Sequence, residues 1–293
     1  MKYAFWPGCV ARGAAPELYK STLAVAQRLG IELVELEAAA CTGAGIISDG
    51  DPYLQDVLNA RTLALAESMN LPLLDICSTC VGVHRLANEK LQQPDYRARI
   101  NERLAPEGLE YKGTADPRHL VWAMLEDLGA DKINAAIKKP LSELHLGPFY
   151  GCYILRPERV LGFDAKPGRK NILETVIQMV GATPVTYDGM TKCCGFPILT
   201  INKKNSLTMT GMHLAEAQGN GADALVTPCP LCHLNLDAQQ ADAAKVVQKR
   251  LDLPILHVPQ LLGLAMGIAP EELGLNRHVV DTGPLLRKAG IAS

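Results

Sequence analysis

All nine cysteines of this 293-residue chain fall into two sets with the same internal order. Each set has a single cysteine, then a two-residue step followed by glycine, then a Cys-x-x-Cys element. The complete set lies in the second half and the incomplete set in the first: Cys152, Cys193, Cys194, Cys229 and Cys232 against Cys9, Cys41, Cys77 and Cys80. Thr42 stands where the first set would have its fifth cysteine. Since the positions from 41 to 80 recur 152 residues later, we infer that one unit has been duplicated.

Converging thiolates of this kind bind metal centres. A Cys-x-x-Cys element offers two thiolates from one turn, and a following helix favours the ionised sulfur through its dipole and free amide groups. Four thiolates suit either tetrahedral zinc or a cubane iron–sulfur cluster. A fifth has no place on zinc, so the second set indicates a larger iron–sulfur centre. A zinc scaffold without redox activity would leave one thiolate idle.

The adjacent pair Cys193–Cys194 needs special backbone geometry. Neighbouring side chains normally diverge, so both can face one centre only if the centre is large or the backbone bends sharply. Gly195 and, in the first half, Gly43 supply the permissive backbone for such a bend.

Composition and charge limit the possible partners and compartment. The 29 basic and 31 acidic residues nearly cancel, and no Lys/Arg run suits a line of phosphates, so we expect no nucleic-acid partner. The amino end lacks the pattern of an export signal, so we expect a cytoplasmic protein whose thiols stay reduced. The most apolar segment, 253–268, is too short to span a membrane. It predicts a buried or docking helix, with a peripheral contact at the inner membrane surface as the alternative.

Strands and helices are predicted to alternate in both halves, which indicates an α/β fold of two Rossmann-like halves with parallel sheets. Glycines at 30 and 181 end corresponding helices. We expect domains at 1–140 and 141–293, the first including a largely helical spacer from about Pro94 to Pro140. The predicted strands are 2–6, 31–36, 71–76, 144–150, 184–187 and 222–227, and the predicted helices are 16–29, 52–69, 171–180 and 205–218. Every cysteine then follows the carboxyl end of a strand, where ligands of such sheets gather.

These motifs resemble the B-type subunit of heterodisulfide reductase and the wider CCG-domain group, named for a motif like Cys193-Cys194-Gly195. The resemblance covers the whole chain and is strongest to bacterial sulfur-oxidising relatives. It implies a non-cubane [4Fe-4S] cluster held by the second set: Cys152, Cys193, Cys194, Cys229 and Cys232. Cys193 and Cys194 would be the catalytic pair in disulfide or thiol electron transfer.

The first half departs from the family pattern at Thr42, because a hydroxyl replaces a soft thiolate poorly. Its metal ligands would be Cys9, Cys41, Cys77 and Cys80, holding a cubane [4Fe-4S] cluster, zinc, or an altered non-cubane cluster. The resemblance also implies partners: an iron–sulfur subunit of the C type, a flavin subunit of the A type, and a sulfur-containing small molecule or lipoyl-protein as substrate. The alternative is an electron-transfer and anchoring subunit of a succinate or fumarate:quinone reductase.

Other side chains near the cysteines have weaker cases. His84 and His233 could donate protons to a released thiolate, but we expect surface or helix-capping histidines. Lys192 could offset anionic cluster charge or be a solvated loop lysine. We assign no role to His213. Aromatic residues beside the second set, such as Phe149 and Phe196, could shield a cluster from water or simply pack in the core.

Overall fold

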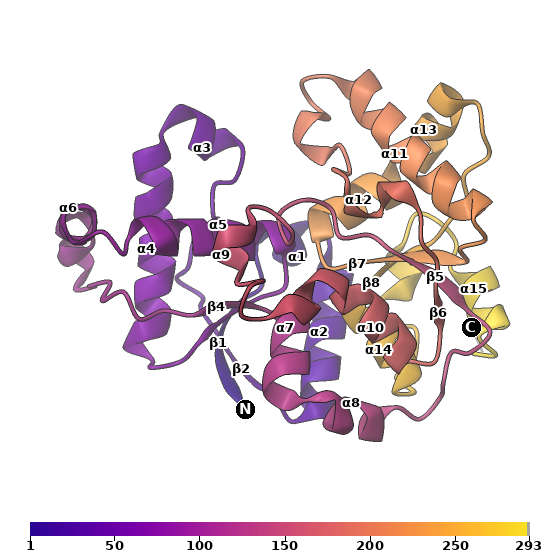
Figure 1. The fold of residues 1–293 in the computed structure, drawn as a ribbon, viewed down its shortest axis with the longest axis horizontal. Helices are drawn as coiled ribbons and strands as arrows, with labels where there is room; N and C mark the ends of the chain where they lie inside the picture. The colour runs from indigo at the N-terminus through magenta and orange to yellow at the C-terminus, as the bar shows by residue number, and fades with distance from the viewer. Residues whose placement is uncertain (292–293) are drawn as a thin grey trace.

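The computed structural model describes residues 1–291, which form two four-stranded sheets (Figure 1). Their strand orders are β2-β1-β3-β4 and β6-β5-β7-β8, and every pairing is parallel. The register places Phe5 opposite Leu74 in the first sheet and Pro148 opposite Val226 in the second. The predicted α/β class with two similar halves and parallel sheets is therefore confirmed.

The first sheet and its helices occupy residues 2–136. The strands are β1 (Lys2–Trp6), β2 (Glu32–Glu35), β3 (Leu73–Asp75) and β4 (Pro117–His119). The α-helices are α1 (Cys9–Gly13), α2 (Pro16–Leu29), α3 (Ile46–Gly50), α4 (Pro52–Ser68), α5 (Ser78–Lys90), α6 (Pro94–Leu104), α7 (Leu120–Ala123) and α8 (Ala130–Ala136). A 3-10 turn follows α6 at Ala105–Glu107, and a π-helical turn follows α7 at Met124–Leu128.

The second sheet and its helices occupy residues 145–288. The strands are β5 (His145–Pro148), β6 (Thr183–Pro184), β7 (Ala224–Thr227) and β8 (Ile255–His257). The α-helices are α9 (Glu158–Leu161), α10 (Ile172–Met179), α11 (Lys203–Gly219), α12 (Pro230–Ala238), α13 (Gln240–Val247), α14 (Val258–Ala265) and α15 (Gly283–Lys288). Single 3-10 turns lie at Pro167–Asn171, Asp188–Thr191, Phe196–Ile198 and Leu275–Arg277.

The sequence rules for helix ends hold at the helices nearest the cysteines. Helix α2 begins at Pro16, and Gly30 caps its end after Leu29 in the left-handed conformation, with a φ of 67°. The side chain of Asp51 caps α4 by accepting from the amide of Leu54, and Asn202 does the same for α11 at Asn205.

The outer strands β4 and β8 correct two predictions. The spacer 94–140 was predicted to be largely helical, yet β4 crosses it and completes the first sheet. The segment 253–268 was predicted to be one buried or docking helix, but it supplies strand β8 before helix α14. Its burial was predicted correctly. Strand β6 is also shorter and earlier than the predicted strand at 184–187.

The two halves share their hydrophobic core, which consists of two clusters that each contain residues of both halves. Helices α2 and α14 pack directly against each other, and their apolar residues join those of α7 and α10 in a single cluster (Figure 1). This cluster includes Phe5 and Leu74 of the first sheet together with Leu146 and Leu256 of the second. Because the core runs across both sheets, neither half buries its own inner helices alone.

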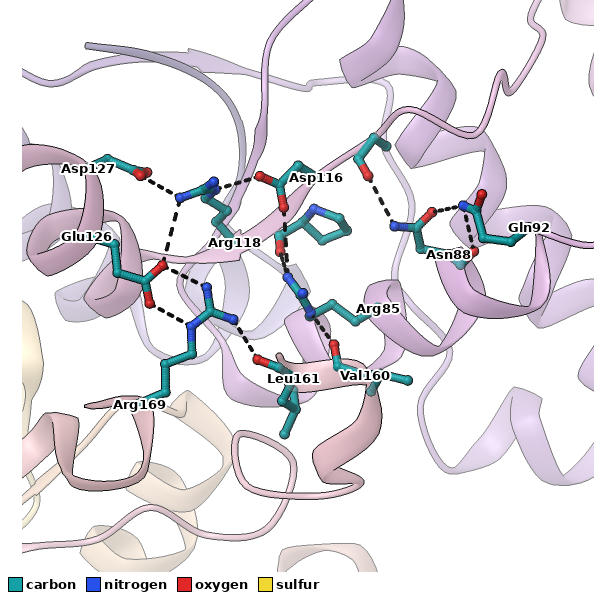
Figure 2. A network of polar contacts seen from close by, with 12 residues as sticks. Arg85, Asn88, Gln92, Asp116, Arg118, Glu126, Asp127, Val160, Leu161 and Arg169 are labelled. Carbon is teal, nitrogen blue, oxygen red and sulfur yellow. Dashed lines mark hydrogen bonds and ion pairs between the residues drawn. The ribbon is translucent and has the colours of Figure 1, made fainter. Parts of the chain in front are cut away.

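A polar network also links the halves (Figure 2). The buried Arg169 guanidinium forms two bonds with Glu126, of 2.6 and 2.7 Å, and stacks 4.2 Å over the Trp122 ring. Arg85 of α5 donates to the carbonyls of Pro117 and Val160, which lie on opposite sides of residue 140. The described residues contain no helix that is both long and apolar enough to cross a membrane.

Candidate metal and redox centre

The structure brings the nine cysteines to the carboxyl edges of the two sheets. Cys9 and Cys152 follow β1 and β5, while Cys77 and Cys229 follow β3 and β7 and cap helices α5 and α12. Both Cys-x-x-Cys elements therefore lie at helix N-termini, where the helix dipole favours thiolates. The cysteines are free.

The five sulfurs of the second half form one continuous group. Neighbouring thiols of this set shift one another's pKa values, in the pairs Cys152–Cys193, Cys193–Cys194, Cys194–Cys232 and Cys232–Cys229. Cys152 and Cys193 are partly accessible, whereas the other three are buried. The adjacent pair thus faces the same site, and the group is open only on the side of Cys152 and Cys193.

Gly195 provides the bend that turns both neighbouring cysteines to one side. Its φ is 93°, and a methyl group on its Cα would lie 2.9 Å from the carbonyl oxygen of Ser206. The Gly195 amide approaches Cys193 Sγ at 3.4 Å, and the next amide approaches Cys194 Sγ at 3.5 Å. No larger residue could hold this turn without strain.

Buried side chains hold the backbone of the pair from behind. Asn235 donates to the carbonyl of Cys194 at 2.7 Å, and Thr210 donates to the same oxygen at 3.1 Å. His213 Nε2 lies 3.0 Å from the Cys193 carbonyl, a distance that requires its N–H to donate. Sequence reasoning missed Asn235 and Thr210, and it gave His213 no role. Thr210 and His213 lie on α11, at least 16 residues from any cysteine, whereas Asn235 lies on α12 three residues after Cys232.

The first half repeats this arrangement with Thr42 in the place of Cys194. Cys9 Sγ lies 3.4 Å from Cys41 Sγ, and the buried Thr42 hydroxyl lies 4.0 Å from Cys80 Sγ. Gln55 and Asn59 of α4 donate to the Thr42 carbonyl at 3.2 and 3.0 Å, as Asn235 and Thr210 do to Cys194. Thr42 therefore directs a hydroxyl group at the first sulfur group, where the second half has the thiol of Cys194.

The two sulfur groups meet at the interface between the halves. Cys77 Sγ and Cys229 Sγ are 4.0 Å apart, and the Thr79 hydroxyl lies 3.6 Å from Cys229 Sγ. His119 Nε2 lies 3.0 Å from the carbonyl of Pro228 and so ties β4 to the residue before Cys229. The nine sulfurs thus form a single region rather than two remote sites.

Local contacts favour ionised sulfur at several positions. The pKa of Cys41 falls to about 6, mainly because the Cys9 thiol donates to it and then because of the Gly43 amide. The pKa of Cys193 is lowered first by Cys152, and that of Cys229 first by Cys232. The partners that donate, such as Cys9 and Cys152, have raised pKa values for the same reason. Thiolates are the form that binds metal.

The spacing of the sulfurs is wider than one zinc ion would require. Among the described residues, the groups of three ligand-type side chains within 4.8 Å of one another contain only histidines and carboxylates. Thiolates on one tetrahedral zinc, with bonds of about 2.3 Å, would lie about 3.8 Å apart. Pairs of cysteines approach this closely, but no three of them do so together. A cluster with several metal ions fits such a set better.

The histidines near the cysteines differ from the surface or capping residues predicted. His84 and His233 are buried, with 0% and 2% exposure, so the expectation of solvent-facing side chains was wrong. His84 Nδ1 pairs with the buried Asp75 at 2.9 Å. Lys192 is exposed beside the complete set, and Phe149 and Tyr150 are fully buried. Sequence periodicity could not show this burial, which comes from packing between the halves.

Comparison with known proteins agrees with the paired arrangement of the cysteines. The CCG cysteine-rich domain family matches residues 3–83 and 147–237, once in each half. The chain belongs to this family. The two matched segments contain every cysteine described above.

Relatives match over nearly the whole chain. The 8-methylmenaquinol:fumarate reductase membrane anchor subunit of Wolinella succinogenes is 40% identical over 97% of this chain and 99% of its own length. The B-type subunit of the ferredoxin/F(420)H(2)-dependent CoB-CoM heterodisulfide reductase of Methanosarcina acetivorans is 32% identical over 98% of this chain and 96% of its own. The B-type subunit of the ferredoxin:CoB-CoM heterodisulfide reductase of Methanosarcina mazei is 30% identical over the same shares. The predicted resemblance to the B-type subunit of heterodisulfide reductase is confirmed.

A solved structure shows the same fold. A hypothetical protein from Helicobacter pylori superposes with a TM-score of 0.76 at 17% identity, covering 96% of this chain. The chain spans about half the length of that protein, 52%.

Proposed function

We propose that this chain is an iron–sulfur redox subunit of a heterodisulfide-reductase-like complex, acting on sulfur groups. Its second half would bind a non-cubane [4Fe-4S] cluster through Cys152, Cys193, Cys194, Cys229 and Cys232. The observation that carries the proposal is the continuous group of five sulfurs, open on one side. Membership of the CCG family and the B-type relatives from heterodisulfide reductases support it.

The first half would hold a [4Fe-4S] cluster through Cys9, Cys41, Cys77 and Cys80. Zinc remains the second possibility for this set, because four thiolates satisfy either. The sulfur spacing and the 4.0 Å approach of Cys77 to Cys229 favour a cluster, since electrons could then pass between the halves.

The bound cluster would supply one-electron transfer and an iron site for substrate sulfur. The side chains of this protein do the remaining work. Buried Phe149 and Tyr150 keep water from the inner side, while the partly accessible Cys193 leaves an approach for a disulfide. Cys193 and Cys194 would be the catalytic pair, and Gly195, Asn235 and Thr210 would fix them in position.

Partner subunits must supply the electrons and any hydride chemistry, because the sequence has no dinucleotide-binding glycine motif. We propose an iron–sulfur subunit of the C type and a flavin subunit of the A type, on the cytoplasmic side. Exposed Ile46 and Ile201, with 90% and 83% exposure, follow Cys41-Thr42 and Cys193-Cys194 in sequence and offer apolar contacts for such a partner.

A second candidate function follows from the Wolinella relative, whose name describes a subunit of a fumarate reductase. This chain would then pass electrons between quinol and a fumarate- or succinate-converting partner. The sulfur site would serve electron transfer without binding a sulfur substrate.

The deciding experiment is an activity comparison on the native complex, purified without oxygen. Reduction of disulfides, or turnover of lipoyl-bound thiols, that is lost in the Cys193→Ser complex supports the first function. Quinol-dependent fumarate reduction without any turnover of sulfur compounds would overturn it in favour of the second. Metal analysis that finds zinc but no iron would overturn both.

A further inference from the structure

A second cluster of metal-ligand side chains lies where the two halves meet. Glu17 comes from α2, His233 from α12 one residue beyond Cys232, and His257 from the end of β8. All three are buried, with exposures of 4%, 2% and 0%. The His233 and His257 rings are stacked with centroids 4.0 Å apart.

The two imidazoles have no hydrogen-bond partners among residues 1–291. Both ring nitrogens of His233 and both of His257 are buried and unbonded. The backbone of Ile255 lies near His233, but no hydrogen bond of acceptable geometry forms. Buried polar atoms nearly always have a hydrogen-bond partner, so four nitrogens without one at the same place indicate a bound ligand.

One ligand atom from each of the three side chains lies within 4.8 Å of the other two. Glu17 Oε1 lies 3.6 Å from His257 Nε2 and 4.0 Å from His233 Nδ1, too far for hydrogen bonds. Atoms bound to one tetrahedral ion at about 2.0 Å would lie about 3.3 Å apart. Because the two rings are stacked and imidazole binds a metal through a lone pair in the ring plane, one of the two rings would have to rotate out of the stack for both nitrogens to reach one ion.

A neighbouring histidine is less suited to bind. Gln260 is held by the His257 amide and the Leu273 carbonyl, so its NH₂ group faces His278 Nε2 at 2.9 Å. His278 Nε2 must accept there, which leaves its proton on Nδ1. Asp237 is occupied by the amides of Val279 and Val280.

We propose that Glu17, His233 and His257 bind one zinc ion. Two imidazoles and a carboxylate are a ligand set that zinc favours, and three protein ligands leave a fourth position for a non-protein ligand. Arg277 lies 3.5 Å from the other carboxylate oxygen, Oε2, and so orients Glu17 without competing for Oε1. The site is separate from the sulfur groups and does not depend on the proposed redox function.

The first half offers a matched contrast. His119 ends β4 as His257 ends β8, and each precedes a helix. His119, however, has partners on both nitrogens: the Pro228 carbonyl at 3.0 Å and the Val121 amide at 3.2 Å. The same position in the duplicated unit is therefore satisfied by protein in one half and left unsatisfied in the other.

The site would join the halves, because its carboxylate comes from the first and its imidazoles from the second. The test is elemental analysis and zinc K-edge absorption of the cluster-loaded protein, purified without oxygen and supplied with zinc. We expect one zinc per chain with nitrogen and oxygen neighbours at about 2.0–2.1 Å rather than sulfur at about 2.3 Å. Glu17→Gln and His257→Gln should each weaken zinc binding by more than about 100-fold, beyond the usual cost of losing an outer-shell partner.

His119→Gln is the control and should keep its zinc, and so should Cys41→Ser. Unchanged cluster absorbance in Glu17→Gln shows that this variant is folded, and it carries the test if His257→Gln does not fold. Wild-type protein that takes up no zinc, or zinc with sulfur neighbours only, would overturn the proposal. So would full zinc content in both ligand variants.

Discussion

At the scale of single residues, one position distinguishes the two sulfur groups. Cys194 and Thr42 occupy equivalent places, each with its carbonyl held by buried donors and its side chain directed at the second cysteine of a Cys-x-x-Cys element. A hydroxyl oxygen is a poorer ligand than a soft thiolate for zinc and for the iron of iron–sulfur clusters. We therefore expect the duplicated halves to differ in their capacity for metal.

Replacing Cys194 with Ser should remove the second-half cluster or convert it to a smaller one. The hydroxyl keeps the shape but loses the fifth thiolate. We expect a loss of up to about four irons per chain, and loss of the second-half EPR signal, with first-half metal retained. Cys41→Ser should give the reverse pattern, and unchanged iron and spectra in Cys194→Ser would contradict the assignment.

Replacing Thr42 with Cys tests the same difference in the opposite direction. Its side chain is buried and already lies 4.0 Å from Cys80 Sγ, so a thiolate there would complete the first group. We expect altered first-half EPR and absorption spectra, read against Thr42→Ser as the control. Spectra identical to those of the wild type would mean that residue 42 does not reach the metal.

At the scale of elements, the bend at Gly195 and the helices behind it determine the geometry of the pair. The bend could be predicted from the sequence, because two neighbouring side chains can face one site only if the backbone turns sharply, and glycine allows such a turn without steric cost. The anchoring residues Asn235 and Thr210 were not predictable, since they lie on helices whose approach depends on tertiary packing. The same holds for the burial of His84 and His233.

Strands β4 and β8 were missed for a related reason. Each has three residues, and β4 reads Pro-Arg-His, which has no apolar alternation. Their strand character comes from pairing with β3 and β7, which local sequence does not encode. The longer elements, such as β1, α2 and α11, carry their own periodicity and caps and were predicted nearly to the residue.

Replacing Gly195 with Ala should destabilise the protein by about 2–4 kcal/mol, from the left-handed backbone and the overlap with Ser206. Gly219→Ala is the control, because it ends α11 with open space around it and should change stability by at most about 1 kcal/mol. Anaerobic denaturant unfolding measures both. Equal stability of the two variants would show that the bend is not strained.

At the scale of the whole molecule, the shared core and the network of Figure 2 make the halves one unit. Arg169 and Glu126 lie on opposite sides of residue 140 and are both largely buried. The predicted domain boundary stays a prediction, but it does not correspond to a break in packing.

Replacing Arg169 with Met should lower the free energy of unfolding by about 3 kcal/mol, because it removes both short bonds to the Glu126 carboxylate and leaves it only the longer contact with Arg118, at 4.0 Å. The exposed pair of Lys203 and Asp242 provides the control, and Lys203→Met should cost less than about 1 kcal/mol. Urea unfolding followed by circular dichroism compares them. A loss for Arg169→Met no larger than that of the control would show that this network does not hold the halves together.

The 4.0 Å approach of Cys77 to Cys229 has a consequence for charge. With a redox centre on each side, a surplus electron on one would repel a second electron on the other, because little solvent separates their ligands. The midpoint potentials of the two centres would then be anticooperative, with the second reduction shifted to a lower value by the first. Such a protein would take up its second electron at a lower potential than its first.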